Sequence, residues 1–394
     1  MGAKAHARRL GLFAFVFLVY ALSPVGTAGD SRWTVPLARS IVRDGDVNLR
    51  EVAPAIAAAD YYAVGCFDRT WQYPATACPS GELRYYYPVA LSVIAAPVVA
   101  VFDAVVGAGR PTNVTEILTA SVFAAAAAVV MMEIGLLTLP WPKALAFALV
   151  FAFATPMWSV ATRALWQHGP SALCNALVLW LVLRRGSSLA MGALMALAYF
   201  LRPTNVVPEL LLVGWLVMER RQRVWPLFVG AGAVGLVFVS LSWMNYGTLL
   251  EPYFSPKRLG GSVSIAAVAA YLISPGRGIF VFMPYLLLAM RGWTRFEGLM
   301  GATVGVQVLL YAAQPDWYGG ASYGPRYLTD VLPHLFVLFL PAMQWRAAPL
   351  ILVAVLIHGR GATSMAVHEW SKTPVDVNAA PERLWDWRDP SFLR

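Results

Sequence analysis

The sequence predicts an all-α polytopic membrane protein, and its composition and its apolar runs both support this fold class. Of its 394 residues, 59% are hydrophobic and only 13% are charged, whereas a soluble domain usually has about 25% charged residues. Apolar runs close to the ~20 residues that cross a bilayer as a helix recur along the chain. A helix satisfies its backbone polar groups within its own segment, as lipid requires. We therefore expect membrane-spanning helices rather than a soluble core.

About eleven segments are predicted to span the membrane. They are Leu10–Val25, Val114–Leu137, Lys143–Trp158, Gly169–Leu183, Leu189–Leu201, Val206–Met218, Val224–Trp243, Ile279–Met290, Gly298–Ala313, Leu328–Met343 and Ala348–Ile357. The first follows Lys4, Arg8 and Arg9 and is interpreted as an uncleaved helix. A signal peptide cleaved at the small residues 26–28 is the alternative.

Short basic clusters between these segments indicate the orientation of the chain. They are Arg184–Arg185, Arg220–Arg223, Arg291–Arg295 and Arg346. The positive-inside rule places them in the cytoplasm together with the N-terminus. These clusters also account for the formal net charge of +9 without a nucleic-acid partner. We expect a multi-pass protein of the plasma or inner membrane that binds no nucleic acid.

The apolar run Tyr85–Val106 does not fit this alternation, because a further crossing there would move every later basic cluster outside. We therefore expect a re-entrant or membrane-surface helix over residues 85–106. Residues 28–113 then form one large extracytoplasmic loop within a transmembrane domain of residues 1–359. Residues 360–394 form a short extracytoplasmic tail.

The outer loops contain most of the polar sequence, including two of the three cysteines. Cys66 and Cys78 have a spacing that can close a disulfide in an oxidising compartment, and two free thiols are the alternative. Cys174 lies in a predicted helix and is interpreted as a small core residue. Further outer segments are Ala161–His168, Asn245–Arg277 and Gln314–Tyr327.

Asp30 is the main candidate for a catalytic residue. It directly follows the first helix in Gly29-Asp30-Ser31-Arg32, at the level of the outer headgroups, where a carboxylate can accept a proton from a hydroxyl. A helix cap or a solvated turn is the alternative for Asp30. Asp46, in Arg43-Asp44-Gly45-Asp46, has the pattern of a solvated turn.

Several basic residues on the outer side depart from the positive-inside trend. They are Arg202, Lys257, Arg258, Arg277 and Arg326. Arginine offers bidentate, charge-assisted hydrogen bonds to phosphate oxygens, and contact with lipid headgroups by snorkelling side chains is the alternative. Glycines and prolines flank Arg277 and Arg326 and indicate a fixed loop geometry, which favours a functional role.

Aromatic and hydrogen-bonding side chains crowd the same outer segments. The candidates for a sugar or lipid platform are Trp317, Tyr318, Tyr323 and His168, and an ordinary interfacial aromatic belt is the alternative. No second His or Cys stands at ligand spacing from His168, so we predict no metal site there; a need for a divalent metal stays open. No phosphate-binding or dinucleotide-binding glycine motif is present, so an activated substrate is expected to arrive on a lipid.

The ordered set of these motifs resembles the GT-C superfamily of membrane glycosyltransferases, which includes protein O-mannosyltransferases and lipid A aminoarabinose transferases. The resemblance covers roughly Leu10–Pro341. It rests on Gly29-Asp30-Ser31-Arg32, Tyr85-Tyr86-Tyr87-Pro88, Arg202-Pro203-Thr204, Asn245-Tyr246-Gly247, Glu251-Pro252-Tyr253, Ser274-Pro275-Gly276-Arg277-Gly278, Trp317-Tyr318-Gly319-Gly320 and Gly324-Pro325-Arg326-Tyr327-Leu328.

The resemblance implies that Asp30 is the general base of an inverting transfer from a polyprenyl-phosphate sugar donor. Arg326 and Arg277, with Arg202 or Lys257, would then hold the phosphate as negative charge develops on it. Many family members carry an Asp-Glu pair in this loop, whereas Ser31 follows Asp30 here. This departure keeps Asp46 as the alternative base.

These observations predict an enzyme that transfers sugar from the lipid carrier to an envelope glycan or glycolipid at the outer face of the membrane. A transporter or lipid flippase is the first alternative, and Glu133 is its main buried candidate. No convincing internal repeat supports that class. A non-catalytic assembly factor or a membrane acyltransferase is the second alternative.

Overall fold

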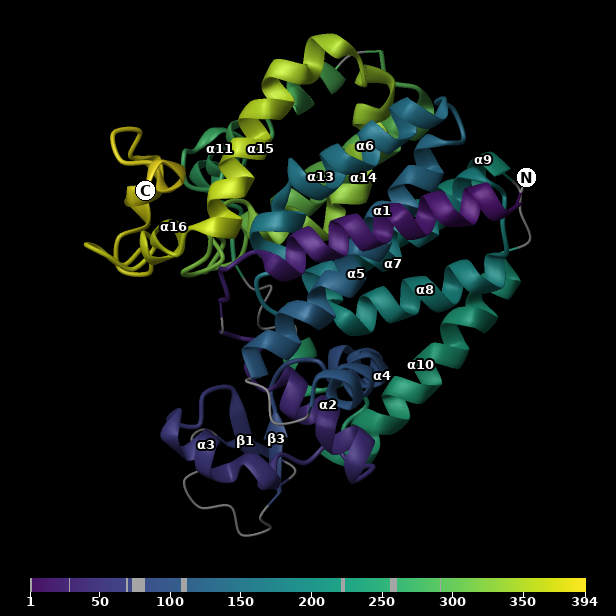
Figure 1. Ribbon diagram of the computed structural model, residues 1–394. Helices are drawn as coiled ribbons and strands as arrows, with labels where there is room; N and C mark the ends of the chain where they lie inside the picture. Colours follow the sequence, from purple (N-terminus) through teal and green to yellow (C-terminus); the bar gives the residue numbers. More distant parts are fainter. Residues whose placement is uncertain are drawn as a thin grey trace.

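The computed structural model describes residues 2–27, 29–68, 70–72, 82–107, 112–220, 224–255, 261–290 and 292–394. Long helices form a bundle, and the first loop forms a smaller unit at one end of it (Figure 1). The bundle helices are α1 (Gly2–Leu22), α5 (Thr112–Gly135), α6 (Trp141–Phe153), α7 (His168–Leu183), α8 (Ser188–Leu201), α9 (Val206–Arg220), α10 (Trp225–Tyr246), α13 (Arg295–Ala312), α14 (Leu332–Phe339) and α15 (Ala348–Thr363).

Further elements connect these helices. The first-loop unit contains α2 (Thr34–Arg43), α3 (Ala53–Ala58), β1 (Val64–Asp68), β2 (Thr70–Gln72), β3 (Leu83–Tyr85) and α4 (Val89–Val106). Later in the chain come α11 (Ile265–Ile273), α12 (Ile279–Phe282) and α16 (Ala366–Glu369). The 3₁₀ turns include Pro203–Asn205, Pro252–Phe254, Pro284–Ala289, Arg326–Val331 and Pro381–Trp385, and a π turn covers Met157–Ala161.

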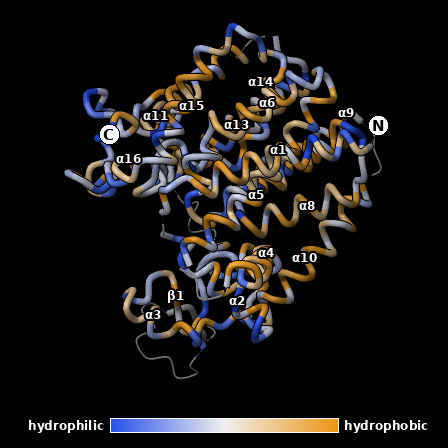
Figure 2. The backbone as a smooth tube through the Cα atoms, in the orientation of Figure 1, coloured by the Kyte–Doolittle hydropathy of each residue, from blue (hydrophilic) through white to orange (hydrophobic). Residues whose placement is uncertain are grey.

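The helices have the apolar character that a membrane protein requires. Within the described residues, four helical segments are long and apolar enough to cross a bilayer: Ala3–Leu22, Val89–Val106, Thr112–Gly135 and Trp225–Tyr246. Figure 2 shows hydrophobic residues running along α1, α8 and α10, and more hydrophilic residues in the C-terminal part of the chain. All the segments predicted to span are largely helical, although Ile279–Met290 is divided between α12 and a 3₁₀ turn that begins at Pro284.

The helix α4 is apolar and long, yet it runs across the bundle. Figure 1 shows α4 nearly end-on, whereas α1 and α8 are seen from the side. It packs on α2, where Arg39 forms two hydrogen bonds to the Asp103 carboxylate, at 2.8 and 2.7 Å. A helix that lies on the membrane surface would run across the bundle in this way. The position of α4 relative to a membrane stays a prediction.

Two expectations for the first loop need correction. The chain is not entirely α-helical, because β2, β1 and β3 form a three-stranded antiparallel sheet in that order. Tyr85 pairs with Val64 in this sheet rather than beginning a helix. The helix begins at Val89, after Pro88, since proline disfavours the helical conformation in the residue before it. Glu251 accepts a hydrogen bond from the backbone N–H of Val89, at 3.0 Å, at this helix start.

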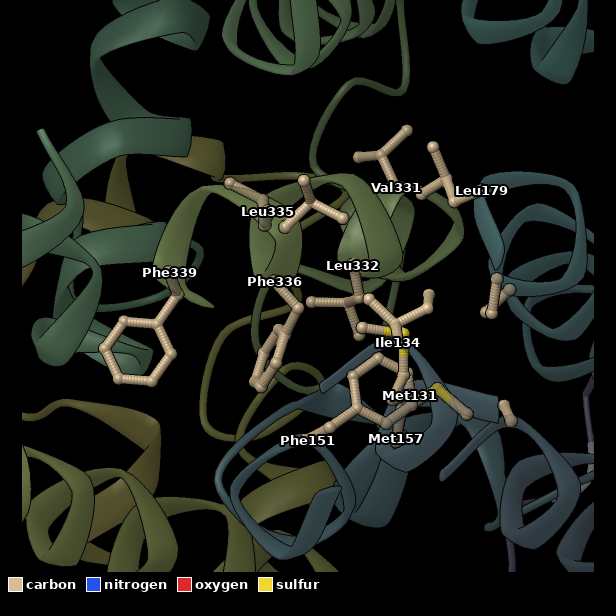
Figure 3. Packing of buried hydrophobic residues seen from close by; sticks show 14 of the residues in the cluster. Met131, Ile134, Phe151, Met157, Leu179, Val331, Leu332, Leu335, Phe336 and Phe339 are labelled. Atoms are coloured by element: carbon tan, nitrogen blue, oxygen red, sulfur yellow. The ribbon is translucent and has the colours of Figure 1, made fainter. Parts of the chain in front are cut away.

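Aromatic and aliphatic side chains from α5, α6, α7 and α14 fill the centre of the bundle (Figure 3). Phe336 of α14 meets Phe151 of α6 edge to face, with ring centroids 5.0 Å apart. Such aromatic pairs add about 0.5–1.5 kcal/mol to the stability gained from burial. The packing fixes α14, which directly follows the 3₁₀ turn that starts at Arg326.

Two glycines let α8 and α10 approach closely. A Cβ at Gly192 would lie 1.8 Å from the carbonyl oxygen of Leu227, and one at Gly230 would lie 2.0 Å from that of Leu189. Both distances are shorter than any real contact. The helix pair therefore requires glycine at both positions.

Glu133, the residue that favoured a transporter, forms an ion pair with Arg9. The Arg9 guanidinium donates two hydrogen bonds to the Glu133 carboxylate, each 2.8 Å long. Arg9 is 42% exposed, so the pair lies near the N-terminal end of the bundle rather than in its centre. Glu133 is therefore explained by a helix–helix contact.

The C-terminal segment, residues 364–394, packs on the rest of the protein. The helix α15 continues to Thr363, past the predicted boundary at residue 359. Trp370 and Leu384 are buried, and the N–H of Gly276 donates to the carbonyl of Leu384 at 3.1 Å. This segment is part of the same folded unit.

Candidate active site

A cavity of about 740 Å³ opens where several distant parts of the chain meet. Its walls come from the turn after α1, the rest of the first-loop unit, the loop before α7, the turns after α8 and α10, the loop between α13 and α14, and the C-terminal segment. Asp30, Arg326 and Arg202, three of the predicted site residues, line it. A cavity of this size can hold one or two sugar units.

Both oxygens of the Asp30 carboxylate are engaged. Oδ1 accepts a hydrogen bond from the Tyr62 hydroxyl at 2.6 Å, and Oδ2 accepts one from Arg326 at 2.8 Å. The hydroxyl of Tyr85 donates to the backbone carbonyl of Asp30. The first-loop unit therefore holds Asp30 in one orientation toward the cavity.

Opposing effects determine the charge state of Asp30. Burial raises the pKa of its carboxyl, but the positive charge of Arg326 and the hydrogen bonds from Tyr62 and Arg326 outweigh burial, so the pKa lies below its ordinary value. Burial and the Asp30 charge raise the pKa of Tyr62 to about 12. At neutral pH the pair therefore consists of a carboxylate and a protonated tyrosine.

Arg326 lies between Asp30 and a buried polar group. Its guanidinium carbon is 3.8 Å from the centre of the Trp166 ring, a cation–π contact. Its Nε donates to His168 Nε2 at 3.4 Å, and one terminal nitrogen donates to the Gly319 carbonyl at 3.5 Å. These long hydrogen bonds leave Arg326 donors for a ligand in the cavity.

Behind Arg326, a fully buried carboxylate joins two more predicted site residues. Asp330 Oδ1 lies 2.9 Å from His168 Nδ1, and Oδ2 lies 2.6 Å from Arg202 Nε. Tyr311 donates to the same Oδ2 at 3.1 Å. Asp330 thereby sets the orientation of His168 and Arg202, and of Arg326 through His168.

This arrangement occurs in a fold with a known counterpart. The crystal structure of ArnT from Cupriavidus metallidurans bound to undecaprenyl phosphate superposes with a TM-score of 0.58 and 18% sequence identity, covering 91% of this chain and 64% of the ArnT chain. The chain therefore has the same overall fold as ArnT over most of its length. No family model matches the sequence, and no curated protein matches it. The chain spans less than two thirds of the ArnT chain.

Arg277 does not line the cavity in this fold. It is 1% exposed, and its guanidinium donates to the carbonyls of Tyr318, Gly320 and Gly276 at 2.6, 2.9 and 2.9 Å. These bonds fix the loop that carries Gly319 and Gly320, both of which line the cavity. Arg277 is therefore placed to shape the site rather than to contact a ligand.

The four residues predicted for a sugar or lipid platform are not among the described residues that line the cavity. Trp317, Tyr318 and Tyr323 are absent from the cavity lining within the described residues, and the Tyr323 hydroxyl instead donates to the Ile357 carbonyl at 2.7 Å. His168 lies behind Arg326 and is 1% exposed. The aromatic residues that line the cavity are Tyr62, Tyr85, Tyr87, Trp166, Tyr253, Phe254 and Tyr327.

The remaining predicted residues lie elsewhere or beyond the described chain. The Asp46 carboxylate accepts hydrogen bonds from the Ser40 hydroxyl at 2.7 Å and the Asn48 N–H at 3.0 Å, which makes it a turn residue away from the cavity. Cys66 lies in β1, but Cys78 lies outside the described residues, so their pairing stays a prediction. Lys257 also lies outside them.

Sequence reasoning did not single out three residues that the fold brings to the site. Arg32 lines the cavity, is exposed, and makes no side-chain hydrogen bond or ion pair within the described part of the chain. Glu116 of α5 accepts hydrogen bonds from the Ser31 hydroxyl at 2.7 Å and the Leu165 N–H at 3.3 Å, which joins two walls of the cavity. Asp330 is the third.

Arg32 could have been found from its place in the Gly29–Arg32 motif. Asp330 and Glu116 are isolated carboxylates within apolar helical sequence. Because burying a carboxylate costs free energy, their presence there could have indicated a functional role. Among the described residues, no group of three or more His, Cys, Asp and Glu side chains is arranged to hold a metal ion.

Proposed function

We propose that the protein is an inverting glycosyltransferase that moves a sugar from a polyprenyl-phosphate carrier to a hydroxyl of an envelope glycan or glycolipid at the outer face of the membrane. The observation that carries the proposal is the Asp30 carboxylate, held in a cavity beside Arg326 and the unpaired Arg32. The fold supports it, because the similar ArnT structure contains undecaprenyl phosphate.

Asp30 acts as the general base in this proposal. The acceptor hydroxyl takes the place of the Tyr62 hydroxyl or lies beside it, and gives its proton to Asp30 as its oxygen attacks C1 of the sugar. The bond between C1 and the phosphate oxygen breaks, and polyprenyl phosphate leaves from the opposite face. One direct displacement inverts the configuration at C1.

Arg32 and Arg326 hold the donor phosphate in this proposal. Arg32 has free donors. Arg326 can turn the nitrogen atoms that form its long hydrogen bonds toward a phosphate. When Arg326 shares its charge with the phosphate, it stabilises Asp30 less, which raises the pKa of that carboxyl and makes it a stronger base. Donor binding thus prepares the base.

Residues behind the cavity have supporting roles. Asp330 orients His168, which accepts a hydrogen bond from Arg326, and Asp330 also holds Arg202 at the cavity wall. Arg277 fixes the loop with Gly319 and Gly320. We assign no phosphate contact to Arg277, because its donors already meet three carbonyls. The apolar side chains of Leu91 and Phe254, which also line the cavity, mark the path of the polyprenyl tail.

Binding of undecaprenyl phosphate to the purified protein tests the donor site. The change in tryptophan fluorescence reports binding, since Trp166 lies against Arg326. We expect Arg32→Gln to weaken binding by about tenfold or more, as for loss of a charged hydrogen bond. Arg50→Gln, an exposed arginine of the same loop outside the cavity, should bind like wild type. Wild-type affinity of Arg32→Gln would remove Arg32 from the donor site, and no binding by wild type would contradict the carrier.

A further inference from the structure

The C-terminal segment reaches the cavity that contains Asp30. Met365, His368, Glu369 and Lys372 line it together with residues of the first loop. The sequence predicted only a tail there, and the mechanism above uses none of these side chains.

The wall is held in place by the rest of the protein. His368 Nε2 lies 2.8 Å from the Gly361 carbonyl, and the Ser371 hydroxyl donates to the Ser322 carbonyl at 2.9 Å. Trp370 is 2% exposed, and its indole N–H donates to the Asp389 carbonyl at 2.8 Å. Because these anchors are the chain neighbours of Glu369 and Lys372, those two residues keep fixed backbone positions. A preformed wall costs a ligand little ordering entropy.

Glu369 and Lys372 differ from the anchors because their side chains are free. Both are exposed, and neither side chain forms a hydrogen bond or an ion pair within the described residues. The Lys372 N–H donates to the Glu369 carbonyl at 2.8 Å, so the two residues occupy one turn. A carboxylate accepts hydrogen bonds and an ammonium donates them. Together they match a ligand whose groups do both, as sugar hydroxyls do.

The cavity lining contains two sets of charged side chains. The first is Arg32, Arg326 and Asp30, whose two guanidinium groups suit a phosphate. The second is Glu369, Lys372 and Asp316, whose carboxylate accepts a hydrogen bond from Tyr327 at 3.2 Å. No hydrogen bond or ion pair within the described part of the chain joins residues 29–34 to residues 365–372, and the loop of Ser322 and Arg326 contacts both.

We propose that residues 365–372 form the acceptor-binding wall of the cavity, with Glu369 and Lys372 bonding to hydroxyls of a neutral glycan unit. This inference rests on the proposed function and names its acceptor class. An anionic acceptor would meet the carboxylates of Glu369 and Asp316, and a cationic one would meet Lys372. A site built to bond hydroxyls rejects ligands that lack them.

The test uses two readouts on the full-length protein. Mass spectrometry of envelope glycans measures transfer in a strain that lacks the gene and is complemented with each variant, and fluorescence measures undecaprenyl phosphate binding. The variants are Glu369→Gln, Lys372→Gln and the double variant that combines both substitutions. The matched controls are Glu382→Gln and Arg388→Gln, which are exposed on the same segment but do not line the cavity.

The double variant should transfer about tenfold less sugar, as for loss of charged hydrogen bonds, while it binds undecaprenyl phosphate like wild type. The controls should match wild type in both readouts. Wild-type transfer by the double variant would overturn the inference, and so would a parallel loss of carrier binding, because the wall would then serve the donor. If deletion of the gene removes no sugar although the protein binds the carrier, the proposed function fails first, and the acceptor wall fails with it.

Discussion

The pair of Asp30 and Arg326 is the central feature at the scale of single residues. The two are 296 positions apart in the chain, yet the Arg326 guanidinium lies 2.8 Å from the Asp30 carboxylate. Each partner of this ion pair holds the other in its charged form. Asp30 is thereby kept as the carboxylate that a general base requires, and Arg326 is kept as the cation that binds a phosphate.

The Arg326→Gln variant tests how this pair sets the charge of Asp30. Burial of Asp30 remains in the variant, but the opposing charge is lost, so the pKa of Asp30 rises. In the proposed mechanism activity needs the carboxylate, so it falls as pH drops through that pKa. The acid limb of the pH–rate profile should therefore move to higher pH, while Arg50→Gln leaves it in place. An unmoved limb in Arg326→Gln would show that Arg326 does not control Asp30.

Single residues also show which features of the site could not be predicted from the sequence. Asp30 and Arg326 could be predicted because each stands at a polar break just outside an apolar run. Arg277 stands in an equally suggestive glycine-rich and proline-rich context, but its side chain points to three carbonyls. The direction of a side chain depends on how loops fold over one another, and no local pattern contains that information.

At the scale of elements, apolar length predicted the helices well, since a membrane helix needs a long apolar run. The sheet of the first loop was missed because its strands are short and contain glycine and cysteine rather than a clear alternation. The start of α4 was placed too early, because Tyr85, Tyr86 and Tyr87 looked like part of the apolar run. Turn chemistry at Pro88 determined the boundary instead.

The contact between α8 and α10 makes a prediction about stability. In Gly192→Ala the new methyl group would meet the Leu227 carbonyl at 1.8 Å, so the helices must separate, at a cost of about 1–3 kcal/mol. Gly235→Ala lies on α10 with nothing within 4 Å, and it should be neutral or stabilising by up to about 1 kcal/mol. Thermal unfolding of the purified proteins in detergent compares them. Equal midpoints for the two variants would contradict the close contact.

At the scale of the whole molecule, the site depends on topology. The cavity draws on residues near positions 30, 166, 326 and 369, and the proposed orientation puts all four regions on one side of the membrane. The positive-inside rule gives that orientation from sequence alone. The convergence of the C-terminal segment on the first loop could not be predicted, because it depends on the packing of Trp370 and Leu384 against the outer loops.

Labelling of single introduced cysteines tests the orientation. Ala379→Cys, exposed on the C-terminal segment, should react with a membrane-impermeant maleimide in intact cells under non-reducing conditions. Arg346→Cys, exposed in the turn before α15, should react only after the membrane is permeabilised. The chain without either substitution serves as the background. Reaction of Arg346→Cys in intact cells would place the basic turns outside the cell. The cavity would then lie on the cytoplasmic side of the membrane, because it lies on the opposite side from these turns.

Sugar transfer that depends on Asp30 is the central claim, and mass spectrometry of envelope glycans tests it most directly. The strains compared lack the gene or carry wild type, Asp30→Asn or Asp46→Asn at matched protein levels. We predict that one sugar disappears on deletion, returns with wild type and with Asp46→Asn, and stays about 10²–10⁴-fold reduced with Asp30→Asn. A full return of that sugar with Asp30→Asn would contradict the account.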